Sequence, residues 1–274
     1  MTTTASQEIY GKAYGGNAAE NYERFFVPAI GAPLANDLIA MAQLRLGERV
    51  LDVACGTGIV ARRAAERVGT SGSVAGVDLT AAMLTVARAV ATAASVPIHW
   101  YETSAEAMPL PDDAFDVVFC QLGLQFVADK EAALGEMRRV LAPGGRVFVS
   151  VPGPSPFFEV LHDAFARHGA ASAAAFVHLV FSLHDQREVE RLFRRAGFSA
   201  VETRSDDKQL RLPQPLEFFW QYVQSTPLAA ALGQDDQLRA AMERDVPAAW
   251  QPWVEDDHMT YSQPVLIASG RKEE

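Results

Sequence analysis

The sequence predicts an α/β fold in which a mostly parallel, doubly wound sheet of seven strands carries helical lid insertions. Two observations lead to this prediction. From Arg49 to Pro152, short apolar runs alternate with segments whose apolar residues recur at helical spacing. Such alternation favours parallel strands joined by right-handed helical crossovers. In addition, the glycine-rich corner CGTG at 55–58 follows the first apolar run and opens a helical pattern, as in Rossmann-like nucleotide sites.

The first half of the chain accounts for five strands and three helices. Strands are expected at 49–54, 73–79, 98–103, 117–120 and 146–152, and helices at 59–68, 80–94 and 129–141. Thr80 is a suitable N-cap for the second helix. Pro143 and the two glycines after it end the third helix.

Beyond Pro152 the pattern changes. Phe157, Leu161 and Phe165 follow each other at four-residue intervals and therefore share one face of a helix. Asp185 and Glu188 have the form of a capping box before another helix, and strands six and seven are expected at 198–204 and 264–271. The remaining segments, 153–183 and 208–257, are interpreted as helical insertions that form a lid above the sheet edge with the glycine corner. This divides the chain into an N-terminal helical segment (1–48), a cofactor-binding core (49–152) and a remainder with strands six and seven (153–274).

Composition limits the possible partners. Acidic residues outnumber basic ones 34 to 24, for a formal net charge of −10, which disfavours nucleic acid. The N-terminus lacks the features of a signal peptide, and no apolar window is expected to approach the roughly 18 residues of a membrane span. Cys55 and Cys120 have no C-x-x-C partner, so neither a metal site nor a disulfide is expected, and the default location is the cytoplasm. The oligomeric state stays open, a homodimer included.

The glycine corner raises the question of which cofactor it binds. Residues 56–61 fit G-x-G-x-x-G/A, and Asp78 follows Gly58 by 20 positions, as expected for NAD. However, Asp52 lies four residues before Gly56. A pyrophosphate about 4 Å from that carboxylate would be repelled by roughly 4 kcal/mol at an intermediate dielectric constant. A ligand with an ammonium and a sulfonium group reverses the sign, which favours S-adenosylmethionine (SAM) over NAD.

Four ordered motifs resemble the class I SAM-dependent methyltransferases, in the methyltransferase type 11 branch that includes ubiquinone- and menaquinone-biosynthesis enzymes. These motifs are VLDVACGTG, VAGVDLTAAML, SAEAMPLPDDAFDVVFC and EMRRVLAPGGRVFVS, which together span Arg49 to Val151 in the order and spacing of the family. One G-x-G would be weak evidence, whereas four motifs in order are strong evidence.

The resemblance implies a role for each matching residue. Asp52, Gly56 and Gly58 would hold the aminopropionate arm, and Asp78 would accept both ribose hydroxyls. Leu79 and Met83 would pack on the adenine, the Ala105 N–H would bond to its ring, and the Gln121 carbonyl would lie near the sulfonium. Ala54 and Ser104 depart from the glycine and aspartate that are common in relatives, and the serine would weaken the hold on the adenine. The full predicted cofactor set is Tyr14, Tyr22, Asp52, Ala54, Cys55, Gly56, Gly58, Asp78, Leu79, Met83, Ser104, Ala105, Glu106 and Gln121.

The expected activity is transfer of a methyl group from SAM, with S-adenosylhomocysteine (SAH) as product, to an O or C atom of a small, partly apolar molecule. In-line displacement at an activated methyl group requires alignment more than a particular catalytic residue. His162, His178, His184 and Gln125 are the candidates for a base or positioning group. An N-P-P-Y-type motif does not follow the fourth strand, which disfavours amino-group methylation of nucleic acid. The alternatives are a non-catalytic SAM-binding regulator or partner protein, and an NAD-dependent oxidoreductase.

Overall fold

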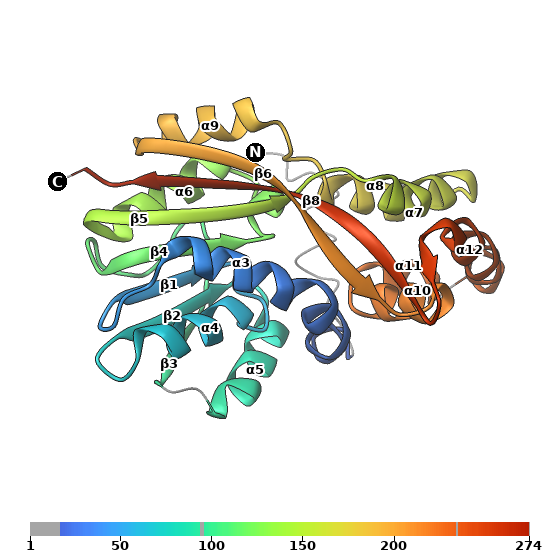
Figure 1. The fold of residues 1–274 in the computed structure, drawn as a ribbon, viewed down its shortest axis with the longest axis horizontal. Coiled ribbons are helices and arrows are strands. Elements are labelled where there is room, and N and C mark those ends of the chain that lie inside the picture. Colours follow the sequence, from blue (N-terminus) through green and yellow to red (C-terminus); the bar gives the residue numbers. More distant parts are fainter. Residues whose placement is uncertain (1–16, 94–95, 234, 274) are drawn as a thin grey trace.

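A single mixed sheet forms the centre of the protein (Figure 1). The computed structural model describes residues 17–93, 96–233 and 235–273. In this part of the chain the strand order is β3-β2-β1-β4-β5-β8-β6, and the short β7 pairs with β8. The strands are β1 (Arg49–Val53), β2 (Ser73–Asp78), β3 (Ile98–Glu102), β4 (Phe115–Gln121), β5 (Leu141–Pro152), β6 (Ser199–Leu212), β7 (Val254–Glu255) and β8 (His258–Arg271).

Helices connect these strands and also precede them. The N-terminal run consists of α2 (Ala18–Asn21), the π-helix η1 (Tyr22–Gly31) and α3 (Ala32–Ala42). The remaining helices are α4 (Ile59–Val68), α5 (Ala81–Val90), η2 (Ala91–Ala93), η3 (Leu124–Phe126), α6 (Lys130–Val140), α7 (Pro156–Arg167), α8 (Ala171–Val180), α9 (Gln186–Arg195), α10 (Pro215–Gln224), α11 (Leu228–Leu232), α12 (Asp236–Ala249) and η4 (Gln251–Trp253).

The predicted doubly wound fold is confirmed. Strands β1 to β5 pair in parallel, whereas β8 runs antiparallel between β5 and β6. Alternate residues of a strand point to opposite faces. Val50 and Phe119 therefore join the hydrophobic cluster that contains residues of α3 and α4, while Leu51 and Val118 join the cluster that contains residues of α6 and α9. Burial on both faces explains why these strands are continuous apolar runs in the sequence.

The two C-terminal strands are longer than predicted. Strand β6 continues to Leu212, and β8 begins at His258 rather than at Pro264. Their added lengths pair with each other, for example Lys208 with Gln263. The added part of β6 contains mainly polar and charged residues, which give no apolar pattern. The second insertion therefore starts after Leu212, later than the predicted position 208.

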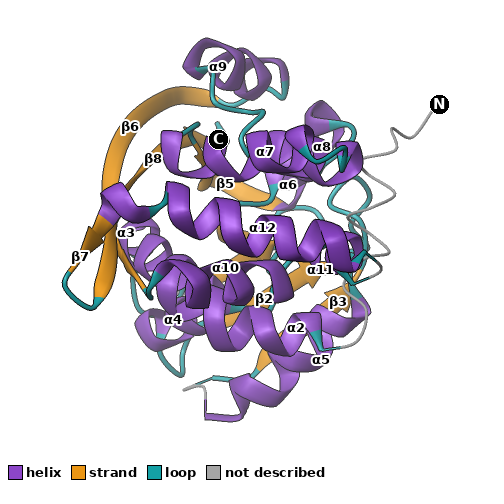
Figure 2. Cartoon of the chain, turned by 90° about the vertical axis from the view of Figure 1, so that its right-hand side faces the viewer, coloured by secondary structure: helices purple, strands orange, loops and turns teal. Residues whose placement is uncertain are grey.

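The two insertions form a helical cap at one end of the sheet (Figures 1 and 2). Helices α7 and α8 come from the first insertion, and α10 to α12 from the second. The rings of Trp250 and Tyr261 both stack on Phe157 with centroid distances of 4.5 Å. The Trp250 indole N–H also donates to the Phe157 carbonyl at 2.7 Å. Trp250 is the first residue of the segment WQPW (250–253), which therefore has a structural role: it joins the two insertions into one core.

The N-terminal run of helix corrects one expectation from the sequence. Residues Ala18–Ala42 form a helical stretch of 25 residues that is apolar and long enough to cross a membrane by length and composition. The prediction that no apolar window approaches span length was wrong for this stretch. Core helices meet the same criterion, and 44% of its most apolar window is buried in the protein. Ala35 and Leu38 are fully buried and belong to the cluster that contains residues of α4.

Candidate functional site

The glycine corner joins β1 to α4 through a backbone that three residues hold in the left-handed region. The φ angles are +54° at Ala54, +54° at Gly56 and +82° at Gly58. The Gly58 N–H donates to the Cys55 carbonyl at 2.8 Å and closes the turn. Glycine adopts such angles without cost, whereas alanine is strained by roughly 1 kcal/mol or more. Ala54 therefore adopts a left-handed angle that glycine takes more easily, at a position where the resemblance leads us to expect glycine.

Asp52 lies below the start of α4, where it is only 1% exposed. Its Oδ2 accepts a hydrogen bond from the Ala61 N–H at 3.0 Å. Burial raises the pKa of Asp52 to about 8, and the nearby Asp78 carboxylate acts in the same direction. A buried acid of this kind favours a cationic ligand, because a positive charge would stabilise its ionised form.

Asp78 ends β2 and organises the corner through both of its oxygens. Oδ2 accepts from the Gly56 N–H and Oδ1 from the Thr80 N–H, each at 2.8 Å. Each carboxylate oxygen has a second lone pair, so the pair can still accept from two hydroxyl groups. Burial raises the pKa of Asp78, although the backbone donors lower it in part.

Trp100 is a feature of the site that the sequence analysis missed. Asp52, Gly76 and Trp100 are paired neighbours across β1, β2 and β3. A Cβ atom on Gly76 would lie 2.5 Å from the indole, and one on Gly58 would lie 2.3 Å from it. Both glycines therefore make room for one ring that supports the corner. The detectable signal was Gly76, since glycine inside an apolar strand often marks close approach of another group.

The predicted adenine loop is held by its own side chains. The Ser104 hydroxyl accepts from the Glu106 N–H and donates to Glu106 Oε2, both at 3.2 Å. Glu106 Oε1 accepts from the Asp129 N–H at 2.7 Å. Ala105, between them, is half-buried. Because the Ser104 proton is already donated within the loop, this serine has only limited capacity left for a ligand.

The other predicted cofactor residues that the structure describes lie around the same corner. Leu79 is 62% exposed next to Asp78, so its apolar surface is open to a ligand. Met83 is buried with alanines of α2, below the N-terminal helix. Gln121 donates its amide N–H to the Gly31 carbonyl at 3.0 Å. Cys55 is buried with a free thiol. Tyr14 lies outside the described residues.

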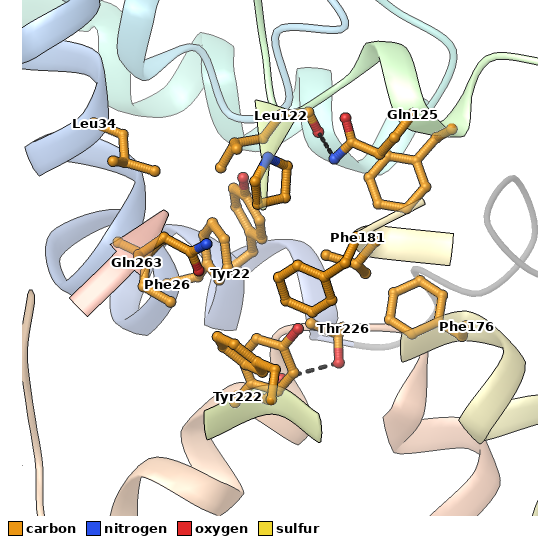
Figure 3. Close-up of a pocket in the computed structure, with 15 residues that line it drawn as sticks. Tyr22, Phe26, Leu34, Leu122, Gln125, Phe176, Phe181, Tyr222, Thr226 and Gln263 are labelled. Atoms are coloured by element: carbon orange, nitrogen blue, oxygen red, sulfur yellow. Dashed lines mark hydrogen bonds between the residues drawn. The ribbon is translucent and has the colours of Figure 1, made fainter. Parts of the chain in front are cut away.

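An aromatic cavity opens between the N-terminal helix and the cap (Figure 3). It encloses about 610 Å³ of empty space, part of it open to solvent, and among its described lining residues none is charged. The lining comes from η1, α3, η3, α7, α8 and α10, from the ends of β4 and β5, and from the interior of β8. It consists of Tyr22, Phe26, Ile30, Leu34, Leu122, Gln125, Phe126, Pro152, Phe158, Phe176, Val180, Phe181, Tyr222, Thr226 and Gln263.

Tyr22 connects this cavity with the glycine corner. It lines the cavity and stacks on Phe26 with a centroid distance of 4.6 Å. On its other side, a Cβ atom on Gly56 would lie 3.7 Å from the Tyr22 ring. The cavity and the predicted cofactor site are therefore direct neighbours, separated by one side chain.

Arg62 fastens the N-terminal helix to the same corner. Its guanidinium donates to the Thr57 carbonyl and to Glu23 Oε1, both at 2.7 Å. Glu23 follows Tyr22 in η1, and both charged side chains are mostly buried. The ion pair therefore fixes the position of Tyr22 between the corner and the cavity.

The candidate histidines lie away from the cavity. His162 contacts Asp163 at 2.9 Å, and its ring centroid lies 6.4 Å from that of His178, on the outer side of α7 and α8. His184 is exposed and bonds to the Phe181 carbonyl. The geometry thus gives these imidazoles no support as a base. Gln125 does line the cavity, and its amide N–H donates to the Leu122 carbonyl at 3.0 Å.

Comparisons with known proteins agree with this geometry. Residues 50–145 match the family described as a methyltransferase domain. The ubiquinone/menaquinone biosynthesis C-methyltransferase UbiE of Stenotrophomonas maltophilia is 45% identical over 129 residues, which cover 46% of this chain and 49% of that protein. UbiE of Xylella fastidiosa (strain M23) is 35% identical over 175 residues, which cover 58% of this chain and 69% of that protein. The chain thus spans about half of the first relative and about two thirds of the second.

A solved structure shows the same fold. Haemonchus contortus phosphoethanolamine N-methyltransferase 2, in complex with phosphomonomethylethanolamine and SAH, has a TM-score of 0.63 and 19% identity. That match covers 99% of this chain and 61% of the other. The glycine corner with its two buried acids suits a ligand that carries positive charge. The chain belongs to the class I SAM-dependent methyltransferases of the ubiquinone/menaquinone-biosynthesis type, enzymes that use SAM as methyl donor.

Proposed function

We propose that this protein transfers the methyl group of SAM to a carbon or oxygen atom of a small, largely apolar molecule. The observation that carries the proposal is the contact of Tyr22 with both the aromatic cavity and the glycine corner. A ligand in the cavity would lie next to a ligand in the corner. Methyl transfer requires this arrangement, because the reacting atoms must come within about 3–3.5 Å of each other.

The residues of the chain would contribute binding, orientation and exclusion of water. SAM supplies a methyl group that is already activated on a sulfonium. We propose that Asp52 balances the positive charge of its amino-acid arm and that Asp78 holds the ribose. Leu79 would cover one face of the adenine. The aromatic cap and the N-terminal helix would keep water from the reacting atoms, which suits a displacement that involves no hydrolysis.

The cavity supports an uncharged acceptor. Seven of its lining residues are aromatic (Tyr22, Phe26, Phe126, Phe158, Phe176, Phe181 and Tyr222), and a charged group would be costly to bury among them. The curated relatives are named as C-methyltransferases of ubiquinone and menaquinone biosynthesis, which supports carbon as the methylated atom. We propose the cytoplasm as location, since Cys55 and Cys120 are both free.

We also propose a functional division of the chain. The helical segment before residue 49 and the two insertions would form the acceptor side, because η1, α3, α7, α8 and α10 supply eight of the fifteen residues that line the cavity. Residues 49–152 would form the cofactor side, with strands β6 and β8 as a support that reaches into the cap.

The test is a turnover assay with SAM and a panel of phenols and reduced quinones. Release of SAH together with a product heavier by one methyl group, located on carbon or oxygen by mass spectrometry, would support the proposal. Tight SAH binding without a methylated product from any panel member would favour the non-catalytic SAM-binding alternative. Binding of NADH in place of SAH would favour the oxidoreductase alternative.

The raised pKa of Asp52 predicts that SAH binding releases a proton. Near pH 7 the free protein keeps Asp52 protonated, since burial raises its pKa from 3.8 to about 8. The SAH ammonium would favour the carboxylate, so we expect close to one proton to leave per SAH bound. Calorimetry at pH 7 in phosphate and in Tris should therefore give enthalpies that differ by the difference in buffer ionisation enthalpy.

Asp52→Asn is the matched control and should show no such buffer dependence.

The raised pKa of Asp52 also predicts how the stability of the free protein changes with pH. Asp52 contributes stability below pH 3.8 that is lost as pH rises through about 8, because the unfolded chain releases this proton first. Equal SAH-binding enthalpies in phosphate and in Tris for the unaltered protein would contradict the predicted proton release.

A further inference from the structure

Tyr222 places a phenol hydroxyl at the edge of the aromatic cavity. It lies on α10 and is only 5% exposed. Its ring centroid lies 5.0 Å from that of Phe158, 5.8 Å from that of Phe218 and 6.4 Å from that of Phe26. Three neighbouring rings therefore fix the direction of this side chain, and Figure 3 shows it on the cap side of the cavity.

The Tyr222 hydroxyl has no hydrogen-bond partner within residues 17–93, 96–233 and 235–273, whereas neighbouring hydroxyls do; its oxygen is not among the fully buried polar atoms without a partner, so it keeps accessible surface at the cavity that the residue lines. Thr226, one turn later, donates to the backbone carbonyl of Tyr222 at 3.0 Å. Tyr261, from β8, donates to the side-chain oxygen of Gln263. Buried tyrosine hydroxyls usually find a partner, because an unpaired polar group away from water destabilises the fold.

This orphan hydroxyl is able to serve a ligand as a donor. Burial alone raises the pKa of Tyr222 well above its ordinary value, so the phenol stays neutral and keeps its proton across the physiological range. A phenol in an otherwise apolar wall offers one strong directional contact. Its natural partner is an oxygen atom on the occupant of the cavity.

We propose that Tyr222 is a specificity-determining residue that donates a hydrogen bond to a hydroxyl or carbonyl oxygen of the methyl acceptor. This inference rests on the proposed function of the cavity. It adds that the Tyr222 hydroxyl, which makes no hydrogen bond within the described residues and lines the cavity, gives selectivity for an acceptor that carries an oxygen atom. Sites of this type discriminate strongly against analogues that lack the polar group.

The test uses two probes of nearly equal shape, 2-naphthol and 2-methylnaphthalene, in the presence of saturating SAH. We expect the unaltered protein to bind 2-naphthol at least tenfold more tightly than 2-methylnaphthalene. In Tyr222→Phe the preference should fall to about one, through weaker binding of 2-naphthol only. SAH affinity should not change. Tyr101→Phe, a change at a surface tyrosine of β3, is the matched control and should keep the full preference.

Thermal stability separates this role from a merely structural one. Removing a hydroxyl that makes no hydrogen bond within the described residues should leave the Tm of Tyr222→Phe unchanged, whereas removing a paired hydroxyl should lower it. An unchanged probe preference in Tyr222→Phe, or no preference in the unaltered protein, would overturn the inference. Absence of methyl transfer with the preference intact would instead count against the proposed function alone.

Discussion

Replacing Gly58 by alanine is expected to abolish measurable SAH binding, with a loss of affinity of at least about a hundredfold, or 2.7 kcal/mol. Two effects add at this position. The backbone has φ +82°, which strains any residue with a Cβ atom, and the new Cβ atom would lie 2.3 Å from the Trp100 ring. Either the corner or the indole must move. The backbone N–H groups that face the cofactor would then lose their positions.

Gly144→Ala is the matched control for Gly58→Ala. Gly144 has φ +76°, and a Cβ atom there would meet nothing within 4 Å. The folding stability of Gly144→Ala should fall by only roughly 1–2 kcal/mol, because alanine is strained in the left-handed region, and its SAH affinity should not change. Adding Trp100→Leu to Gly58→Ala should restore part of the binding, because it removes the clash. Calorimetry with SAH and thermal melts on the four proteins would check this. Full SAH affinity in Gly58→Ala would show that the indole yields freely and that the prediction is wrong.

The sheet was predictable from the sequence because its signals are local. Each buried parallel strand is a continuous apolar run, and the corner from Ala54 to Gly58 has its own spacing. The outer halves of β6 and β8 had no such signal. Lys208 pairs with Gln263 in a ladder where polar pairs alternate with the buried pairs Leu210–Tyr261 and Leu212–Met259, so no continuous apolar run marks these segments as sheet. Strand pairing over such distances in sequence depends on the assembled fold.

The cofactor corner could be predicted for the same reason, whereas the cavity could not. Asp52 lies near the carboxyl end of β1 and Asp78 is the last residue of β2, and parallel strands bring their carboxyl ends to one edge of the sheet. In contrast, Tyr22, Phe158 and Tyr222 come from three separate helices. In the sequence each of them resembles an ordinary core aromatic. Their common cavity exists only because the insertions fold back over the N-terminal helix.

The position of the candidate histidines relative to the cavity could not be predicted from the sequence either. Their place in the first insertion made them plausible bases, since this segment was expected to cover the site. However, the helix face decides what a residue contacts. Phe176 and Val180 of α8 point into the cavity, whereas His178 between them is exposed on the opposite side. The weak apolar asymmetry of this alanine-rich helix did not reveal which side faces inward.

Asp78→Ala should reduce SAH affinity by at least about a hundredfold, because one carboxylate serves both the protein and the ligand. It accepts the N–H groups of Gly56 and Thr80, each at 2.8 Å, and would also accept the ribose hydroxyls. Hydrogen bonds to a charged group contribute about 1.5–3 kcal/mol each, so the loss of two ribose contacts already predicts this size. Asp78→Asn keeps one acceptor oxygen, so its SAH affinity should lie between that of Asp78→Ala and that of the unaltered protein.

Asp116→Ala is the matched control for this change. Asp116 is also a strand aspartate, and it accepts from the Arg49 backbone N–H at 2.8 Å and from the Arg49 guanidinium, but it lies away from the glycine corner. We expect it to lose stability and to keep its SAH affinity. Calorimetric titration with SAH, and with NADH in parallel, measures both variants. Asp78→Ala with unchanged SAH affinity would place the ribose elsewhere. A selective loss of SAH binding, with no NADH heat in any variant, would tie the cofactor to this one carboxylate.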